Sequence, residues 1–286
     1  MKVSGFTFLR NGLILGYPFK ESIESILPIV DEFIIALGPC EDDTKEVLES
    51  IKSDKIKIIP TIWNEKMQNR GYVYGQQKMI AQFNCSGDWA FYLEADEVVH
   101  EDDLEKIVEV MKRYKDDDKV EAIAFDYLHF YGNKNTYLDS PAWYRQEVRI
   151  IKNTIRSIAP DGLFWSVLTT NRKCRYPNAV MSGAKIYHYG WVRNEEQMNL
   201  KLQKVTKYWK HKFKPVDYSQ IDSSILREFK GTHPKAVQKW LPQTEGIFKA
   251  DPNYKLTKKD KKQRLKAKIE KIFRINLSKK HFRLVK

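Results

Sequence analysis

The sequence predicts an α/β fold, with a mainly parallel sheet flanked by helices and a helical C-terminal extension. As far as residue 131, short apolar segments alternate with amphipathic ones, as strands and helices do in such a fold. The segment Trp89–Leu93 is apolar almost without interruption, which is typical of a strand buried on both faces. Three carboxylates, Glu94, Asp96 and Glu97, follow it directly.

The order of the predicted elements places the carboxyl ends of several strands at one edge of the sheet. In open α/β sheets ligands bind beyond these ends, so we expect a site there. Amphipathic helices are expected between the first five strands, and a further helix runs through residues 195–209. The expected strands are residues 3–9, 33–37, 55–62, 89–93, 121–131, 143–151 and 184–187.

The carboxylates after residue 93 predict a metal site. Crowded carboxylates repel one another unless a cation lies between them. Oxygen ligands suit Mg²⁺ or Mn²⁺, which usually completes its shell with waters and substrate phosphates. Glu94 and Asp96 are therefore predicted to form a metal–diphosphate site. Residues 101–103 are acidic too, but they are predicted to cap the next helix.

At this point the chain resembles a known family. Leu93-Glu94-Ala95-Asp96-Glu97 resembles the Asp-x-Asp metal motif of the family 2 glycosyltransferases, with Glu94 in place of the first Asp. The resemblance continues at Phe8–Asn11, Gly87–Trp89 and His188–Arg193, so it covers roughly the first two thirds of the chain. It implies a GT-A fold, a nucleotide-sugar donor, Mn²⁺ or Mg²⁺ as cofactor, and inversion at the anomeric carbon.

Two loops supply candidate donor contacts. Arg10 and Asn11 follow the first strand, where Arg10 can hold a phosphate, stack on a base, or form an ordinary salt bridge. Asp42 and Asp43 follow the second strand, where the family has a carboxylate that contacts the nucleotide. Asp43 and Glu46 have the spacing of a capping box, which leaves Asp42 as the predicted nucleotide contact.

Three more residues are candidate donor contacts. Lys78 is expected near the start of a helix, where it can meet a diphosphate, although a solvated surface lysine is the alternative. The resemblance implies that Arg193 reaches the diphosphate. It leaves open whether Glu94 contacts the metal or the ribose.

The resemblance also implies metal ligands and a base. Asp96 and His188 occupy the positions of the metal-binding residues, although a histidine after a strand is otherwise usually just hydrogen-bonded. Asp161 lies in a turn beside Phe164 and Trp165, where apolar rings can raise its pKa toward that of a general base. The alternative is that it bonds its own backbone before Gly162. The resemblance favours the base.

The formal net charge of +13 is concentrated in a C-terminal tail. Residues 255–286 contain 14 Lys or Arg against two acidic residues, so the rest of the chain is nearly neutral. Leu265, Ile269, Ile272 and Phe273 fall on one face of a predicted helix, the pattern of a helix that lies on an anionic membrane. The alternatives are that this face packs on the body or on another subunit.

We expect a catalytic domain at residues 1–193, a helical appendage at 194–254 and a basic amphipathic tail at 255–286. No apolar run approaches the ~20 residues that span a bilayer, and the N-terminus does not resemble a signal peptide. The three cysteines have no paired spacing, which favours a cytoplasmic protein, with or without peripheral membrane contact.

Two other classes of protein remain as alternatives. A sugar nucleotidyltransferase would need a glycine-rich phosphate loop after the first strand, but residues 10–14 contain one glycine. A nucleic-acid-binding protein would carry its basic residues on the folded body, which is close to neutral. The sequence therefore favours a glycosyltransferase whose acceptor is a glycan, a lipid-linked molecule or a protein.

Overall fold

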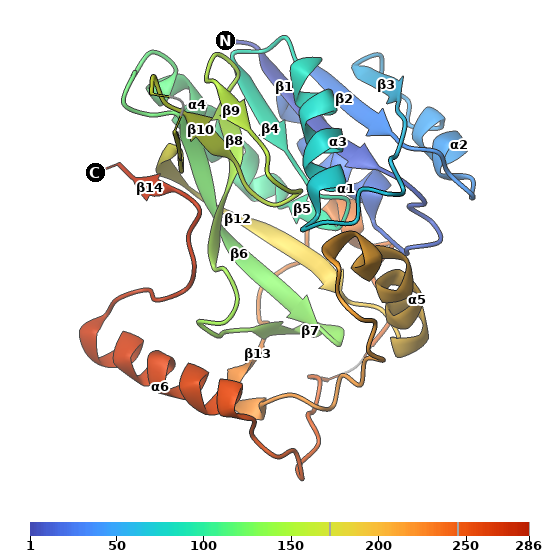
Figure 1. Ribbon diagram of the computed structural model, residues 1–286, viewed down its shortest axis with the longest axis vertical. Helices are drawn as coiled ribbons and strands as arrows, with labels where there is room; N and C mark the ends of the chain where they lie inside the picture. Colours follow the sequence, from blue (N-terminus) through green and yellow to red (C-terminus); the bar gives the residue numbers. More distant parts are fainter. Residues whose placement is uncertain (172, 245, 286) are drawn as a thin grey trace.

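The computed structural model describes residues 1–171, 173–244 and 246–285 (Figure 1). The first half of its central sheet is parallel, as predicted, and its strands lie side by side in the order β4, β1, β2 and β3. Each lies within two residues of its predicted bounds. These strands are β1 (Val3–Leu9), β2 (Glu32–Leu37), β3 (Ile56–Pro60) and β4 (Trp89–Tyr92).

The second half of the sheet is mixed. β8 lies antiparallel between β4 and β6, so β6 runs parallel to β4 without touching it. The long β12 pairs parallel with β6 and antiparallel with β5. Within the described residues only β5, β7 and β8 run against the other strands of this sheet, so the mainly parallel α/β class is confirmed. The bounds are β5 (Glu97–Val99), β6 (Ala122–Tyr131), β7 (Asn133–Leu138), β8 (Gln146–Lys152), β12 (Asn178–Trp191), β13 (Leu226–Glu228) and β14 (Arg283–Leu284).

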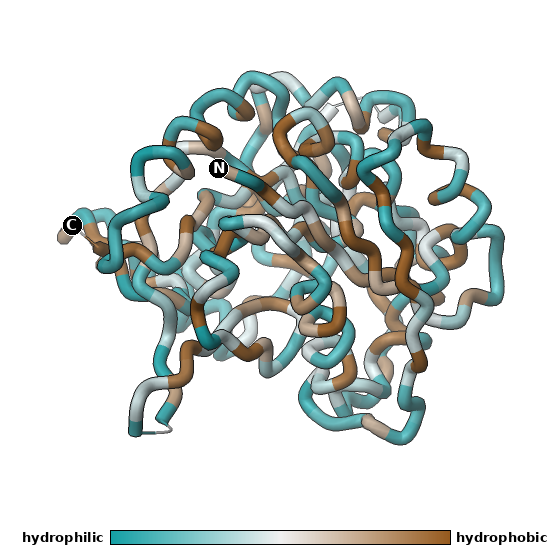
Figure 2. The backbone as a smooth tube through the Cα atoms, turned by 90° about the horizontal axis from the view of Figure 1, so that it is seen from above, coloured by the Kyte–Doolittle hydropathy of each residue, from teal (hydrophilic) through white to brown (hydrophobic). Residues whose placement is uncertain are grey.

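Helices cover both faces of the sheet because its strands are apolar on both sides. Alternate residues of β2 show this: Phe33 and Ile35 join a core with α1, α2 and α4, whereas Ile34 and Ala36 join a core with α3. Figure 2 shows the hydrophobic segments gathered inside the body. The helices are α1 (Phe19–Ile26), α2 (Thr44–Glu49), α3 (Tyr72–Phe83) and α4 (Leu104–Tyr114). A separate small sheet is formed by β9 (Ser157–Ile158), β10 (Ser166–Leu168) and β11 (Cys174–Arg175).

The region after β12 is less helical than expected. α5 (Glu195–Val205) and a 3-10 turn at Thr206–Trp209 confirm the helix predicted for 195–209. Apart from 3-10 turns at Ser223–Ile225 and Lys235–Val237, the described part of 210–257 is not helical, and it adds β13 to the sheet. α6 (Lys258–Phe273) follows, and the chain then returns to pair β14 with β12. The division into three domains remains a prediction.

Candidate active site

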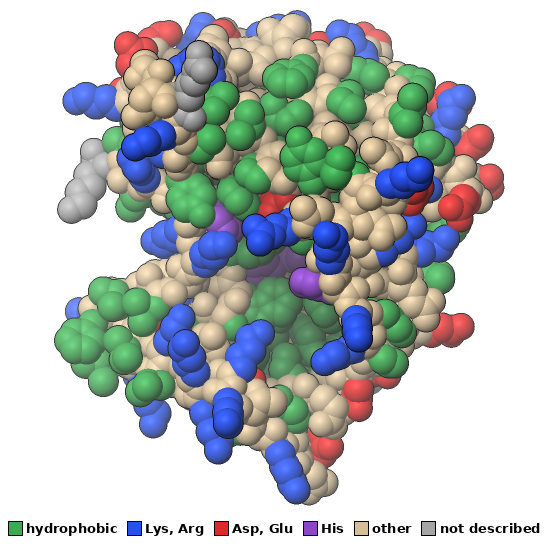
Figure 3. Space-filling view, viewed as in Figure 1, with side chains coloured by type: hydrophobic (Ala, Val, Ile, Leu, Met, Phe, Trp, Pro, Cys, Tyr) green, Lys and Arg blue, Asp and Glu red, His purple; other side chains and the backbone are tan. Residues whose placement is uncertain are grey.

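A cavity of about 390 Å³ lies where the carboxyl ends of β1 and β4 meet β12 and α5. In Figure 3 the molecule is hollowed between its upper body and the part that carries α6, and Lys and Arg side chains line the rim of the hollow. Of the nine predicted site residues, the five that line the cavity are Arg10, Asn11, Glu94, Asp96 and His188. The four that do not line it are Asp42, Lys78, Asp161 and Arg193.

Asp96 is a buried carboxylate surrounded by cations. It follows β4, is 5% exposed, and accepts a 3.0 Å hydrogen bond from Nζ of Lys201 on α5. Nε2 of His188 lies 3.6 Å from its Oδ1, and Nη2 of Arg193 lies 3.9 Å from its Oδ2. Burial alone would raise the pKa of Asp96, but Lys201 and Arg193 outweigh it and hold this pKa well below its usual range. Asp96 is therefore ionised and ready to bind a cation.

His129, which the sequence analysis did not select, fixes the tautomer of His188. Its Nε2 lies 2.7 Å from the carbonyl oxygen of Tyr144, which only accepts, so this nitrogen carries the proton. Burial and then His188 lower the pKa of His129 to about 3, so the ring is neutral and its Nδ1 is an acceptor. The facing Nδ1 of His188, 2.8 Å away, must donate. In neutral His188 the Nε2 therefore carries a lone pair on the side of Asp96.

This pair of atoms fits a divalent cation. A lone pair of His188 and an oxygen of ionised Asp96 face each other at 3.6 Å, an arrangement that a shared cation stabilises. Two protein ligands leave the other positions of Mn²⁺ or Mg²⁺ to water and phosphate oxygens. Gly190 makes the approach possible, because a Cβ there would lie 2.6 Å from Nε2 of His188 and 3.3 Å from Oδ2 of Asp96.

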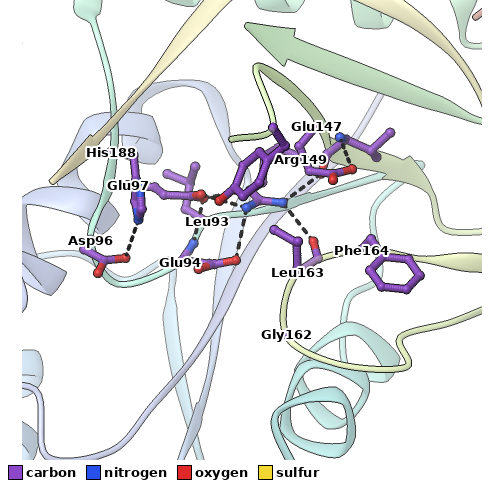
Figure 4. Close-up of polar contacts among 12 residues, drawn as sticks. Leu93, Glu94, Asp96, Glu97, Glu147, Arg149, Gly162, Leu163, Phe164 and His188 are labelled. Carbon is purple, nitrogen blue, oxygen red and sulfur yellow. Dashed lines mark hydrogen bonds and ion pairs between the residues drawn. The ribbon is translucent and has the colours of Figure 1, made fainter. Parts of the chain in front are cut away.

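A buried ionic cluster supports the same edge of the sheet (Figure 4). Arg149 on β8 is fully buried and binds both carboxylate oxygens of Glu97 at 2.7 Å. It also donates to Oε1 of Glu94 at 3.0 Å and to the carbonyl oxygen of Leu163 at 2.9 Å. Tyr127 adds a 2.8 Å hydrogen bond to Glu97. Arg149 thus ties the loop of the metal motif to the loop that contains residues 162 and 163.

Glu94 faces the cavity but is also held by this cluster. Its side chain is 28% exposed, and Arg149 is its ion-pair partner. Burial, together with the negative charge of Glu97, raises the pKa of Glu94 to about 7. Arg149 bonds both Glu94 and Glu97, and its positive charge offsets the repulsion between these two carboxylates.

Lys78 lies neither at a helix start, where the sequence placed it as a diphosphate contact, nor on the surface, which was the alternative. α3 begins at Tyr72, so Lys78 lies in its second turn and is fully buried. Its Nζ donates to the carbonyl oxygens of Gly162 (3.1 Å) and Leu163 (3.2 Å), and it lies 3.4 Å from the ring centroid of Trp165. Burial, and then the charge of Arg149, lower the pKa of Lys78 well below its usual range. Lys78 therefore supports the 162–163 loop and does not face the cavity.

Asp161 lies at the start of the same loop and bonds its own backbone. Its Oδ1 accepts hydrogen bonds from the amides of Leu163 (2.8 Å) and Phe164 (3.4 Å). This is the alternative that the sequence left open. The two residues that follow it, Gly162 and Leu163, line the cavity. Asp161 is thus beside the cavity rather than in it.

Arg10 and Asn11 lie where the sequence placed them, but both already have partners. Arg10 bonds Glu65 through Nη1 and the carbonyl oxygen of Pro39 through Nε at 3.0 Å. Asn11, with a positive φ of 53°, accepts a 2.8 Å hydrogen bond from the amide of Glu41. Both side chains shape the wall of the cavity, and Arg10 lies over the ring of Trp63.

The predicted roles of Asp42 and Asp43 are not what the structure shows. Asp43 is the N-cap residue of α2, but its side chain makes no capping bond. Asp42 instead bonds the hydroxyl and the amide of Thr44, and it accepts a 2.8 Å bond from the amide of Ile14. Its carboxylate therefore joins the loop after β1 to α2, away from the residues that line the cavity.

Arg193 reaches the site from behind. Its Nε donates to the carbonyl oxygen of Leu15 and its Nη1 to that of Gly190, while its guanidinium lies over the ring of Tyr17. Among the described residues its buried Nη2 has no hydrogen-bond partner, and this atom points at Asp96. A buried donor of this kind suits an anionic oxygen from a ligand.

An aromatic wall closes the other end of the cavity. The rings of Trp63, Tyr74 and Tyr208 pack edge to face with centroids 5.5–5.8 Å apart. Phe8 joins them at 5.7 Å from Tyr74. Lysines of the α5 region bond acidic residues on the same rim, Lys204 with Glu41 and Lys207 with Glu65, as Lys201 does with Asp96. α5, with two of these ion pairs, and the 3-10 turn after it, with the third, thus cover the cavity.

A second group of possible metal-binding side chains has another explanation. His100, Glu101 and Asp102 form the only close group of three or more such side chains among the residues described. Nδ1 of His100 accepts a hydrogen bond from the amide of Asp102 as the N-cap of a 3-10 turn (Glu101–Asp103) that leads into α4. The group therefore belongs to a helix start. Residues 101–103 were predicted to cap this helix, but the capping side chain is that of His100, and Asp103 at the N-cap of α4 makes no side-chain capping bond.

The comparisons with known proteins agree with the family that the motif resembles. The family model described as "Glycosyl transferase family 2" matches residues 18–164, half of the chain. The chain belongs to glycosyl transferase family 2. It is therefore a glycosyltransferase in class. No curated protein matches it.

Solved structures with partial similarity include three enzymes. Glucosyl-3-phosphoglycerate synthase from Mycobacterium tuberculosis, in complex with Mn²⁺, UDP and phosphoglyceric acid, has 15% identity and a TM-score of 0.32, over 44% of this chain and 43% of that one. S. aureus TarS has 13% identity and a TM-score of 0.38, over 71% and 39%. Mannosyl-3-phosphoglycerate synthase from Rubrobacter xylanophilus has 18% identity and a TM-score of 0.32, over 45% and 41%. The match thus spans less than half of each of these chains.

Proposed function

We propose that this chain transfers a sugar from a nucleotide-sugar donor to an acceptor hydroxyl in the cavity beside Asp96, with inversion and with Mn²⁺ or Mg²⁺ bound. One observation carries the proposal. A lone pair of His188, oriented by His129, faces the ionised Asp96 at 3.6 Å, and Arg193 and Lys201 stand beside them. Such a site holds a cation and a diphosphate together.

Negative charge develops on the leaving diphosphate when the bond to the sugar breaks. A cation bound by Asp96 and His188 would neutralise part of this charge. Arg193 would donate its unpartnered Nη2 to a phosphate oxygen, and Lys201 would supply a second positive charge. Because these groups are already in place in a buried site, they need little reorganisation during the reaction.

The nucleoside and the acceptor would occupy opposite ends of the site. The wall formed by Trp63, Tyr74 and Tyr208 offers flat rings for a base, and Arg10 and Asn11 lie beside it. Asp42 is engaged elsewhere, so we assign it no donor contact. Inversion requires a base on the face of the sugar opposite the diphosphate. Asp161 remains our proposed base. It directly precedes Gly162 and Leu163, which line the cavity, and Figure 4 shows these two residues on the other side of Arg149 from Asp96.

The test compares Asp96→Asn with the parent chain for sugar transfer in the presence of Mn²⁺. Asparagine keeps the size of the side chain but removes the charge that binds the cation, so turnover should fall by about 10³ or more. The variant should keep its fold, measured by circular dichroism and thermal unfolding, because the cavity admits water to the new amide group. Turnover near that of the parent would show that the cation site is elsewhere.

Two variants serve as controls. Asp118→Asn changes an exposed carboxylate after α4 and should leave turnover unchanged. Asp161→Asn should lower turnover by about 10²–10⁴ while leaving the affinity for the nucleotide sugar unaltered, because general-base catalysis is worth about that much. A loss of donor affinity in Asp161→Asn would instead identify this residue as a support of the 162–163 loop.

A further inference from the structure

We propose that the outward face of α6 docks on an anionic lipid bilayer and holds the chain at a membrane surface. α6 contains eight Lys or Arg residues against two acidic ones, and it lies outside the catalytic site. No helix of the described ranges is long and apolar enough to cross a membrane. Any contact of this helix with lipid would therefore be a surface contact.

The apolar stripe of α6 is turned away from the body. Leu265 is 60% exposed, Ile272 is 72% exposed and Phe273 is 66% exposed, and Ile275, just beyond the helix, is 48% exposed. Figure 3 shows hydrophobic side chains gathered at the outer end of the part that carries α6, with Lys and Arg beside them. Ile269, the fourth residue of the predicted stripe, is half-buried, so the alternative that the stripe packs on the body is wrong for the other three residues.

The opposite face of α6 is polar and braces the helix against the body. Arg264 binds both carboxylate oxygens of the buried Asp222, at 2.7 and 2.8 Å. Glu270 accepts two bonds from Arg145, at 2.9 and 3.0 Å. These are the only ion pairs between α6 and other described segments. The face that an isolated amphipathic helix would bury is thus left for another partner.

Lysines border the stripe on both sides. With 100° between successive residues, Lys261 and Lys268 lie on one side of the stripe and Lys266 on the other, while Lys262 points between the directions of Leu265 and Phe273, near the start of the helix. Within the described chain none of these four forms an ion pair, so their charge is free to meet an external anion. An apolar stripe between two rows of lysines is the pattern of a helix lying in the interface of an anionic membrane.

The combination of charge and apolar surface selects the partner. A nucleic acid would pair with the lysines but would leave the apolar stripe in water. A second copy of this chain would cover the stripe but would bring lysines against lysines, since the chain carries +13 overall. An anionic bilayer satisfies both, because its headgroups meet the lysines and its acyl region receives Leu265, Ile272 and Phe273.

The position of α6 connects membrane docking with the cavity. Glu270 of α6 holds Arg145, whose neighbour Tyr144 lines the cavity and bonds His129 through its carbonyl oxygen. After α6 the chain is fixed again, because the side chain of His281 bonds the buried Glu147 and β14 pairs with β12. The helix is therefore a rigid part of the body. If the proposed function holds, an acceptor carried by a lipid would lie within reach of the site.

The experiment is co-sedimentation of the full chain with vesicles of phosphatidylcholine alone or with about 30% phosphatidylglycerol, at low and high salt. The parent chain should pellet only with the anionic vesicles and should be released by salt. The triple variant Lys261→Glu, Lys262→Glu, Lys268→Glu should bind on the order of 100-fold more weakly. The triple variant Leu265→Ser, Ile272→Ser, Phe273→Ser should also bind more weakly. Its lysines would still contact the headgroups, but no apolar side chain would insert into the acyl region.

A matched control separates location from total charge. Lys112→Glu, Arg113→Glu, Lys119→Glu makes the same change in net charge at exposed positions on and after α4, and it should bind nearly as the parent does. Equal loss in both charge variants would overturn the proposal, because binding would then depend on net charge alone. Concentration-dependent dimerisation that the apolar variant abolishes, without vesicle binding by the parent, would assign the stripe to a second copy. Sugar transfer to a soluble acceptor should be unchanged in the α6 variants, so failure of this proposal is distinguishable from failure of the proposed function.

Discussion

Glu32 and Asp96 are both buried carboxylates of the central sheet, but they lie at opposite ends of its parallel strands. Glu32 opens β2, where Oε1 accepts bonds from Ser4 and Ser86 and Oε2 binds Lys57 at 2.8 Å. Asp96 lies beyond the end of β4, where its partners are the charged groups of Lys201 and Arg193 and the imidazole of His188. Burial is the same, 3% and 5% exposed, and yet the surroundings differ in kind.

The two carboxylates differ in how completely the groups around them are hydrogen-bonded. Around Glu32 every partner is a hydroxyl, an amide or a lysine (Lys57 at 2.8 Å and Lys2 at 4.0 Å), and none of the described cavities adjoins it. Around Asp96 there is an excess of positive charge, a lone pair of His188 and an Arg193 donor that has no partner in the described part of the chain. A fully bonded carboxylate stabilises the fold, whereas an unevenly bonded one beside a cavity is prepared for a ligand.

The largest effect that we expect is the loss of stability on substitution of Arg149. This arginine lies beside the site, and yet its hydrogen bonds are as complete as those of Glu32. Arg149→Met would leave Glu97 as a buried carboxylate without its ion-pair partner. The free energy of unfolding should fall by about 3–5 kcal/mol, the usual cost of breaking a buried pair from one side. Urea unfolding at pH 7 measures it.

The double variant Arg149→Met, Glu97→Gln is the control for the Arg149 prediction. Removing both charges should recover a large part of the lost stability, since the penalty comes from the uncompensated carboxylate. If the double variant is less stable than Arg149→Met, the arginine acts mainly through packing against Tyr92 and Tyr127, whose ring centroids are each 5.4 Å from it.

Substitution of His129 should have the next largest effect, and this effect should be confined to the site at the carboxyl ends of the strands. His129→Leu replaces the buried imidazole with an apolar side chain of similar size, and it removes the acceptor that holds the proton of His188 on Nδ1. Binding of Mn²⁺, measured by titration calorimetry without donor, should weaken by about 10–100-fold, the usual effect of losing a group that orients a metal ligand. The exposed His211→Leu should bind as the parent does. Unchanged Mn²⁺ affinity in His129→Leu would refute the tautomer argument.

The sequence predicted the parts of this site that depend on strand order. The ends of β1 and β4 meet because parallel neighbours share an edge, so Arg10, Asn11, Glu94 and Asp96 were placed by periodicity alone. The family resemblance added His188. The predicted strands, helices and basic α6 followed from the same apolar patterns.

The residues that were missed come from contacts without a local signal. Arg149 and His129 lie on β8 and β6, and only the antiparallel insertion of β8 brings Arg149 beside Glu97. A charged residue inside the apolar run Val148–Ile151 was the one available hint. Lys201 reaches Asp96 through the packing of α5, which no motif marks.

The wrong assignments have a shared cause. Lys78 was given to a helix start, but α3 begins six residues earlier and turns this side chain inward. Asp43 is the N-cap residue of α2 without a capping bond and Asp42 bonds Thr44 instead, because a capping box depends on backbone angles that spacing does not define. In each case the residue type was compatible with two environments, and tertiary packing selected one.

Substitution of Glu32 should have the smallest effect, and it tests whether this carboxylate contributes to stability alone. Burial would raise the pKa of Glu32, but Lys57, Ser4 and Ser86 outweigh it and lower this pKa to about 2 from an ordinary 4.5. A lowered pKa means that the folded chain binds this proton less readily than the unfolded chain. The carboxylate therefore stabilises the fold fully above about pH 4.5, and this contribution is lost as the pH falls from there toward 2.

Glu32→Gln should accordingly lower the free energy of unfolding by roughly 2 kcal/mol at pH 7. The difference from the parent should shrink by about 1 kcal/mol by pH 3.5, because the unfolded parent then takes up the proton. Urea unfolding at pH 7, 5 and 3.5 measures this, with the exposed Glu105→Gln as the control that shows no such trend. Sugar transfer at pH 7 should stay at the parent level, since Glu32 lies at the end of the strands far from Asp96. A stability difference that does not change with pH would mean that Glu32 acts through shape rather than charge, and a loss of turnover would mean that the two ends of the sheet are coupled.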